Sequence, residues 1–148
     1  MKNLSLAFLL LALASSSFAQ ENDDKNEHKK NVVVPNAVKM SFSKEYPNEK
    51  GIWEKEKNQY EVNFKQNGNS MSVLYDVNGN KRETETDIKT SGLPASASTY
   101  ISTHFKGRKI KEASMITKAG GEVNYEAEVN GRDLIFDKDG KYLRAAKD

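Results

Sequence analysis

The fold is decided by the stretch Val34-Pro35-Asn36-Ala37-Val38-Lys39-Met40-Ser41-Phe42-Ser43-Lys44-Glu45-Tyr46, because its pattern occurs twice in the chain. Apolar side chains recur at every fourth position around Pro35: Val34, Val38, Phe42 and Tyr46. The same spacing returns 59 residues later around Pro94: Leu93, Ala97, Ile101 and Phe105. A period-four apolar row opened by proline is typical of an amphipathic helix. We therefore expect two helices, each at the start of an internal repeat.

Strand signals follow the first helix, which Pro47 should end. The chain from Gly51 to Lys57 contains Ile52 and Trp53, and Asn58 is a turn signal before the next strand. Clean alternation in Tyr60–Phe64 and a hairpin signal at Asn67-Gly68 predict a pair of strands with Met71–Tyr75. After the turn Asp76–Gly79, the polar stretch Arg82–Ile88 is expected to be an edge strand, because its charges discourage further strand pairing.

The second half repeats this order after the expected hinge at Ser91-Gly92. Strands are predicted at Ile110–Thr117, Val123–Val129, Asp133–Phe136 and Lys141–Ala145. Tyr60-Glu61-Val62 matches Tyr125-Glu126-Ala127, and the turn Asp76–Gly79 matches Asp137–Gly140. The sequence therefore predicts an α+β fold with two repeats, residues 32–90 and 91–148. Each is a helix plus a four-stranded meander, and together they form one eight-stranded antiparallel sheet with both helices on one face.

The N-terminus carries an export signal. Lys2, the apolar run Leu4–Ala14 and the small residues around Ala19 match the three regions of a signal peptide, so residues 1–19 are expected to be removed. Residues 20–31 contain no apolar side chain and are predicted to form a disordered tether before a single domain at 32–148. We expect a periplasmic or secreted protein without membrane insertion after cleavage.

Composition gives no support for nucleic acid as a partner and excludes sites that need cysteine. The 148 residues include 23 Lys and Arg against 21 Asp and Glu, and cleavage of the leader removes one lysine. This near balance gives no electrostatic reason to expect nucleic acid as a partner. The absence of cysteine excludes disulfides, thiol nucleophiles and thiolate metal sites. Oligomeric state is left open.

The repeated features together resemble a known family. The Val-Pro or Leu-Pro helix openings, the Tyr-Glu strands and the aromatic-Asp-x-Asn/Asp-Gly turns are similar to those of the PepSY-like, beta-lactamase-inhibitor-like family of exported bacterial proteins. The resemblance covers about Val32 to Arg144. It implies tandem helix-plus-sheet repeats, export and no established chemistry. It also suggests binding or inhibition of another exported protein.

Candidates for catalysis or metal binding are few. His28 falls in the predicted tether, and His104 falls on the second helix beside its apolar row. No Gly-x-Ser-x-Gly nucleophile motif is present. Asp137, Asp139 and Gly140 could begin a calcium loop, but the expected twelfth-position glutamate is missing and the glycine spacing is wrong, so a turn is the preferred interpretation. We expect no catalytic residues, cofactor or resident metal.

The predicted sheet face opposite the helices is the candidate docking surface. If Tyr60, Val62 and Phe64 face the helices, two-residue periodicity sends their neighbours to the other side. Trp53 could join that surface or fill the core. The candidate partner-binding residues are Trp53, Glu61, Asn63, Lys65, Leu74, Asn124, Glu126, Glu128 and Ile135.

Three function classes follow from these observations. The first is a non-enzymatic module that binds, and through binding could inhibit, another envelope or secreted protein. The alternative is a periplasmic protein that binds a small ligand or cation through Glu83, Glu85 and Asp87. An enzyme ranks third, and it would need His104 in a pocket with a carboxylate partner.

Overall fold

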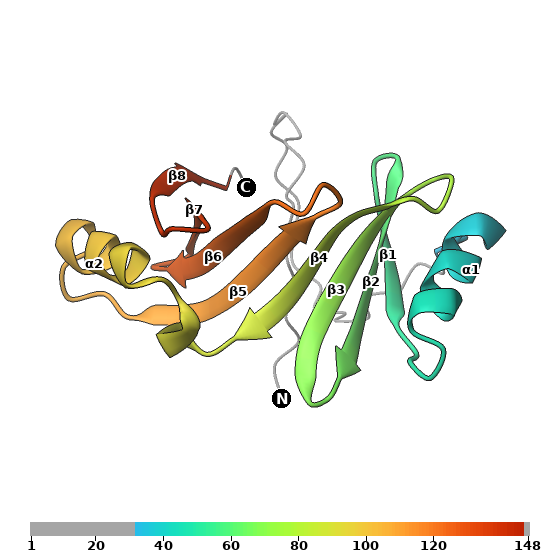
Figure 1. Ribbon diagram of the computed structural model, residues 1–148, viewed down its shortest axis with the longest axis horizontal. Helices are drawn as coiled ribbons and strands as arrows, with labels where there is room; N and C mark the ends of the chain where they lie inside the picture. The colour runs from blue at the N-terminus through green and yellow to red at the C-terminus, as the bar shows by residue number, and fades with distance from the viewer. Residues whose placement is uncertain (1–31, 147–148) are drawn as a thin grey trace, which may run out of the picture.

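One sheet runs through the whole part of the chain that the structure describes, residues 32–146. In this computed structural model, eight antiparallel strands are hydrogen-bonded in their sequence order, β1 to β8 (Figure 1). The prediction of a single eight-stranded antiparallel sheet is confirmed. The predicted signal peptide, its cleavage site and the tether lie outside the described residues.

Each repeat contributes one helix and four strands. The first repeat consists of α1 (Asn36–Glu45), β1 (Ile52–Glu56), β2 (Gln59–Gln66), β3 (Asn69–Asp76) and β4 (Lys81–Ile88). A 3-10 turn, η1 (Thr90–Gly92), occupies the predicted hinge. The second repeat consists of α2 (Ala95–His104), β5 (Ile110–Lys118), β6 (Val123–Val129), β7 (Arg132–Asp137) and β8 (Tyr142–Ala145).

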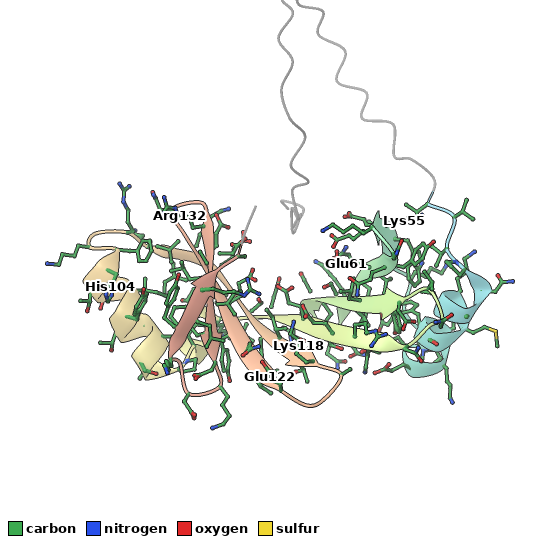
Figure 2. The ribbon with its side chains drawn as sticks, turned by 90° about the horizontal axis from the view of Figure 1, so that it is seen from above. Lys55, Glu61, His104, Lys118, Glu122 and Arg132 are labelled. Carbon is green, nitrogen blue, oxygen red and sulfur yellow. The ribbon has the colours of Figure 1, made fainter. Side chains whose placement is uncertain are left out.

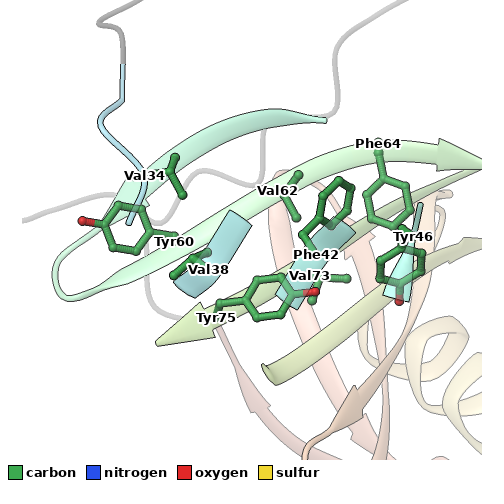
Figure 3. Packing of buried hydrophobic residues seen from close by; sticks show 9 residues of the cluster. All are labelled: Val34, Val38, Phe42, Tyr46, Tyr60, Val62, Phe64, Val73 and Tyr75. Atoms are coloured by element: carbon green, nitrogen blue, oxygen red, sulfur yellow. The ribbon is translucent and has the colours of Figure 1, made fainter. Parts of the chain in front are cut away.

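The apolar row of the first repeat is buried as its spacing predicts. Val34, Val38, Phe42 and Tyr46 pack on side chains of β2 and β3 (Figure 3). The Phe42 and Phe64 rings meet edge to face with centroids 5.1 Å apart, a favourable aromatic geometry. A helix of ten residues is marginal alone in water, so this contact with the sheet is what holds α1.

The second repeat builds a separate core in the same way. Ala97 and Ile101 of α2 pack with Leu134 and Phe136 of β7. Its strands β5 and β6 contribute Ala113, Ala127 and Val129 to this cluster. Figure 1 shows α1 and α2 near opposite ends of the sheet, so each helix covers its own four strands.

The strand register shows that both cores lie on the same face. Cross-strand neighbours share a face of a sheet. One row of partners runs from the first core to the second: Phe64, Met71, Thr86, Met115, Tyr125 and Phe136. The prediction that both helices cover one face is therefore confirmed.

The turns after β3 and β7 are equivalent and use their aspartates structurally. Asp76 Oδ1 accepts hydrogen bonds from the backbone N–H groups of Asn78 and Asn80, each at 2.9 Å. Asp137 Oδ1 accepts them from Asp139 at 3.0 Å and Lys141 at 2.9 Å. These bonds support the turn interpretation over the calcium loop.

Glycines in these turns approach the helices closely. Gly79 and Gly140 both have positive φ, +82° and +79°. A Cβ on Gly79 would lie 2.6 Å from the carbonyl oxygen of Ala37 in α1, and one on Gly140 would lie 2.7 Å from Pro94 Cβ. Because only glycine fits, the two turns fix each helix on its half of the sheet.

The prediction that Arg82–Ile88 forms an edge is wrong. Strand β4 pairs with β3 on one side and with β5 on the other, which joins the two repeats. The polar side chains that suggested an edge instead occupy the middle of the sheet. Glu85 illustrates the difference, since only 6% of its surface is exposed.

Candidate protein-binding face

The sheet curves, and its face opposite the helices lies on the inside of the curve (Figure 2). We call this surface the concave face; it consists of the alternate strand residues that point away from α1 and α2. Figure 2 shows Glu61 toward the space between the two halves of the sheet, whereas His104 lies on the outer side. The curve therefore turns what would be a flat sheet surface into a partly enclosed one.

The register brings side chains of all eight strands onto the concave face. Asn63, Ser72, Glu85, Ile116 and Asn124 form one row of cross-strand partners from β2 to β6. A second row contains Glu54, Glu61, Leu74, Glu83 and Lys118. A third row contains Asp87, Ser114, Glu126, Ile135 and Arg144.

Curvature buries much of this face. The exposed fraction is 4% for Glu61, 6% for Asn124 and 4% for Ile135. Asn63, Leu74, Glu126 and Glu128 are half-buried, and Lys65 is exposed. These eight predicted residues thus lie on the predicted face, but the side chains of neighbouring strands crowd one another on the inside of the curve.

Trp53 does not belong to this face. Its ring packs on the first core, with its centroid 5.5 Å from that of Phe42. Trp53 pairs with Val62, which also faces the helices. The open question of its direction is therefore resolved in favour of the helix side.

Carboxylates dominate the concave face. They are Glu54, Glu56, Glu61, Glu83, Glu85, Asp87, Glu112, Glu126, Glu128 and Asp133. Lys65, Lys118 and Arg144 supply positive charge on the same side. Although the whole chain is close to neutral, this surface is acidic.

Glu85 lies at the centre of the acidic surface, on β4. Burial raises its pKa to about 7, and the nearby carboxylates of Glu61, Glu83 and Asp87 act in the same direction. The nearby hydroxyl of Ser114 on β5 partly opposes the shift. A charged form without a cation is costly in such surroundings, so Glu85 is partly protonated near neutral pH.

Glu61 and Glu126 flank Glu85 in similar environments. Burial raises the pKa of Glu61 to about 7; a hydrogen bond with Ser72 opposes this, and Glu56, Glu54 and Glu83 add to it. Burial also raises the pKa of Glu126 to about 8, with further increases from Glu85, Asp133 and Glu83 and a smaller opposing effect of Arg144. Glu85 thus lies between two other carboxyls with raised pKa values, and its charge adds to the shift of Glu126.

Two lysines pair with other carboxylates of this part of the sheet. Lys118 pairs with Glu83, and Lys111 pairs with Glu128 at 2.8 Å. Within residues 32–146, no ion pair involves Glu61, Glu85 or Glu126. These three acids therefore lack the cationic partner that buried carboxylates usually have.

Asn124 adds an unsatisfied acceptor beside them. Its Nδ2 donates to Glu122 Oε1 at 2.8 Å, while its Oδ1 is buried and has no donor among the described residues. Asn124 shares its row with Glu85 through Ile116. A buried carbonyl oxygen without a donor costs about 1 to 3 kcal/mol, so this position favours a donor from outside.

The enzyme and metal candidates gain no support from the geometry. His104 is exposed, stacks on Tyr100 with ring centroids 4.0 Å apart, and forms no ion pair with a carboxylate in the described chain. Across residues 32–146, no group of three His, Cys, Asp or Glu side chains could hold a metal ion. His28 lies outside the described residues.

Sequence reasoning missed the central role of Glu85 because it placed β4 at an edge. The available signal was the meander itself: a single sheet made of two consecutive meanders must join the last strand of one to the first strand of the next. Applying that rule would have placed Glu85 beside Ser114 and Ile116. Two-residue alternation predicts which face of the sheet a side chain occupies. It does not predict how deeply the acids are buried there.

Comparisons with known proteins agree with this architecture. The family described as "Putative beta-lactamase-inhibitor-like, PepSY-like" matches residues 20–82 and again residues 58–144. The two matches overlap over residues 58–82, and the double match agrees with a tandem repeat. No curated protein matches the chain.

Solved structures share the fold at low sequence identity. A chain described as a putative periplasmic protein from Bacteroides eggerthii DSM 20697 is 18% identical, with a TM-score of 0.70 over 78% of this chain and 89% of that one. A DUF2874 family protein from Bacteroides uniformis ATCC 8492 is 18% identical, with a TM-score of 0.69 over 77% and 89%. A BLIP-like protein from Bacteroides fragilis NCTC 9343 is 21% identical, with a TM-score of 0.58 over 78% and 88%.

Proposed function

From the premise that this chain belongs to the PepSY-like, beta-lactamase-inhibitor-like family, we propose that it is an exported, non-enzymatic module that binds another envelope or secreted protein through the concave face. Solved relatives described as periplasmic support a periplasmic location, to which residues 1–19 would direct the chain as a cleaved signal peptide. No helix within residues 32–146 is long and apolar enough to span a membrane.

The observation that carries this proposal is that polar groups of the concave face lack partners among the described residues. Helices and turns cover the other face of the sheet, so stability is already provided there. The concave face keeps buried acids without cations and a buried carbonyl oxygen without a donor. Such groups reduce stability, and a binding partner that satisfies them would recover this loss.

The shape and composition of the face also suit a protein partner. Leu74, which is half-buried, places apolar surface among the acids. Protein interfaces combine an apolar centre with polar groups that set orientation, and this face offers both. The inhibitory role suggested by the family description would follow if this chain covered a surface that the partner needs for its own activity.

Affinity capture from the native cell envelope tests this function. We expect simultaneous replacement of Glu61, Lys65 and Leu74 by glutamine to remove a captured partner while the melting temperature stays close to that of the wild type. Replacement of the exposed helix residues Lys39 and Met40 by glutamine is the matched control and should retain the partner. A partner that remains bound to the concave-face variant would rule out this face as the site.

A further inference from the structure

We propose that the concave face recognises a basic segment of its partner, with arginine or lysine side chains seated along the line from Glu61 through Glu85 to Glu126. This inference rests on the proposed function and specifies the chemistry of the partner. It predicts a positively charged ligand because the concave face is acidic, although the whole chain is nearly neutral.

The first argument is the spacing of the acids across the sheet. Glu61, Glu85 and Glu126 belong to β2, β4 and β6, so each is separated from the next by one intervening strand. Two strand spacings amount to about 10 Å. An extended or helical segment with two or three basic side chains spans such distances, whereas a single small cation does not.

The second argument is independent of charge. Asn124 Oδ1 is a buried acceptor without a donor in the described chain, and it lies in the same row as Glu85. Glu85 in this row and Glu126 in the next are also acceptors when they are ionised. Guanidinium and ammonium groups consist only of donors, so they complement a site of this composition.

The third argument is that the cations of the chain do not neutralise these three acids. Lys118 is committed to Glu83 on the same face, and Arg144 on β8 lies opposite Ile135. Arg144 opposes the raised pKa of Glu126 less than Glu85, Asp133 and Glu83 increase it. A partner cation therefore meets carboxyls that the chain has not already neutralised.

Binding of a cation should be coupled to proton release. The raised pKa values mean that Glu61, Glu85 and Glu126 are partly protonated near neutral pH. A bound guanidinium favours the ionised form, so the complex binds fewer protons than the free protein. Affinity should rise with pH between about 6 and 8, where these groups titrate.

Titration with a designed peptide tests the inference directly. The probe is acetyl-Gly-Arg-Gly-Arg-Gly-Arg-Gly-amide, and the control is the same peptide with neutral citrulline in place of arginine. NMR should show shifts on the concave-face strands and at least about tenfold tighter binding of the arginine peptide, as charge-assisted hydrogen bonds predict. Affinity should also increase about tenfold from pH 6 to pH 7.5.

Charge variants make the test specific. The combined variant E61Q, E85Q and E126Q should lose at least about tenfold in affinity and most of the pH dependence. Asp139→Asn also removes a carboxylate, but from the exposed turn after β7, and should bind like the wild type. Equal binding of both peptides, or retained binding by the triple variant, would overturn the inference. Envelope capture that still depends on the concave face would then show that the proposed function survives without it.

Discussion

Leu74 on β3 lies directly opposite Glu61 on β2 and also opposite Glu83 on β4. An apolar side chain thus stands between two carboxylates at the position where a cation would be expected. If the concave face accepts a basic group, residue 74 is where the chain can supply one internally.

Leu74→Arg should therefore place a cation of the chain itself between the carboxylates of Glu61 and Glu83. We expect stabilisation of about 1 to 2 kcal/mol at pH 8, because a guanidinium would gain charge-assisted hydrogen bonds to Glu61 and Glu83. The same variant should lose binding of the arginine peptide. Chemical denaturation and peptide titration measure the two effects.

Leu74→Gln provides the uncharged comparison for this experiment. It removes the same apolar contact without adding a cation, so it should not be stabilising at pH 8. If the arginine and glutamine variants have equal stability, the acids at this position do not respond to a nearby cation.

The concave-face acids should make the protein less stable at higher pH. Their folded pKa values of about 7 to 8 exceed the ordinary glutamate value, so the folded state binds more protons than the unfolded state between these limits. The resulting stability is fully present below about pH 4.5 and is lost as pH rises through about 8. For one such carboxyl the effect is on the order of 3 kcal/mol.

Glu85→Gln should remove a large share of this dependence and raise the free energy of unfolding at pH 8. Denaturation curves from pH 5 to pH 8.5 provide the measurement. Asp76, whose pKa is lowered to about 2 chiefly by hydrogen bonds from Asn80, acts in the opposite direction and only below about pH 4. A stability that rises steadily from pH 5 to pH 8 would contradict the assignment of raised pKa values.

Gly79→Ala should be strongly destabilising because two costs combine. The position has positive φ, and the added Cβ would lie 2.6 Å from the Ala37 carbonyl oxygen. We expect a loss of about 2 to 4 kcal/mol, measured by urea denaturation.

Gly68→Ala separates the two costs. Its φ of +86° is similar, but no atom lies within 4 Å of the added Cβ. It should lose only about 1 kcal/mol. Equal losses at both glycines would mean that the contact between the β3–β4 turn and α1 does not position the helix.

Phe42→Ala should cost about 3 to 5 kcal/mol, because it empties a buried site among Tyr46, Trp53 and Phe64. Met40→Ala on the exposed side of α1 should change stability by less than about 0.5 kcal/mol. Thermal unfolding compares the two. If both variants melt alike, α1 is not held by the first core.

Local pattern was enough to predict the architecture. The period-four rows located both helices, and the alternation in Tyr60, Val62 and Phe64 identified the helix side of the sheet. Family resemblance and turn signals agreed with the same arrangement. These features are local, so a single sequence contains them.

The site depended on long-range geometry that local patterns do not contain. Glu61 and Ile135 were placed on the correct face, yet their burial arises from sheet curvature and from neighbours on other strands. Glu85 was assigned to an edge because its strand is polar, whereas pairing between the repeats places it in the centre. Trp53 required its register with Val62.

Site-directed photocrosslinking in the native envelope tests the central claim most directly. The chain has no cysteine, so Asn63→Cys on the concave face and Ser43→Cys on exposed α1 can each carry a single benzophenone label. We predict a discrete crosslinked partner from position 63 but not from position 43, and its loss when E61Q, E85Q and E126Q are added. A partner crosslinked from position 43 alone would contradict binding through the concave face.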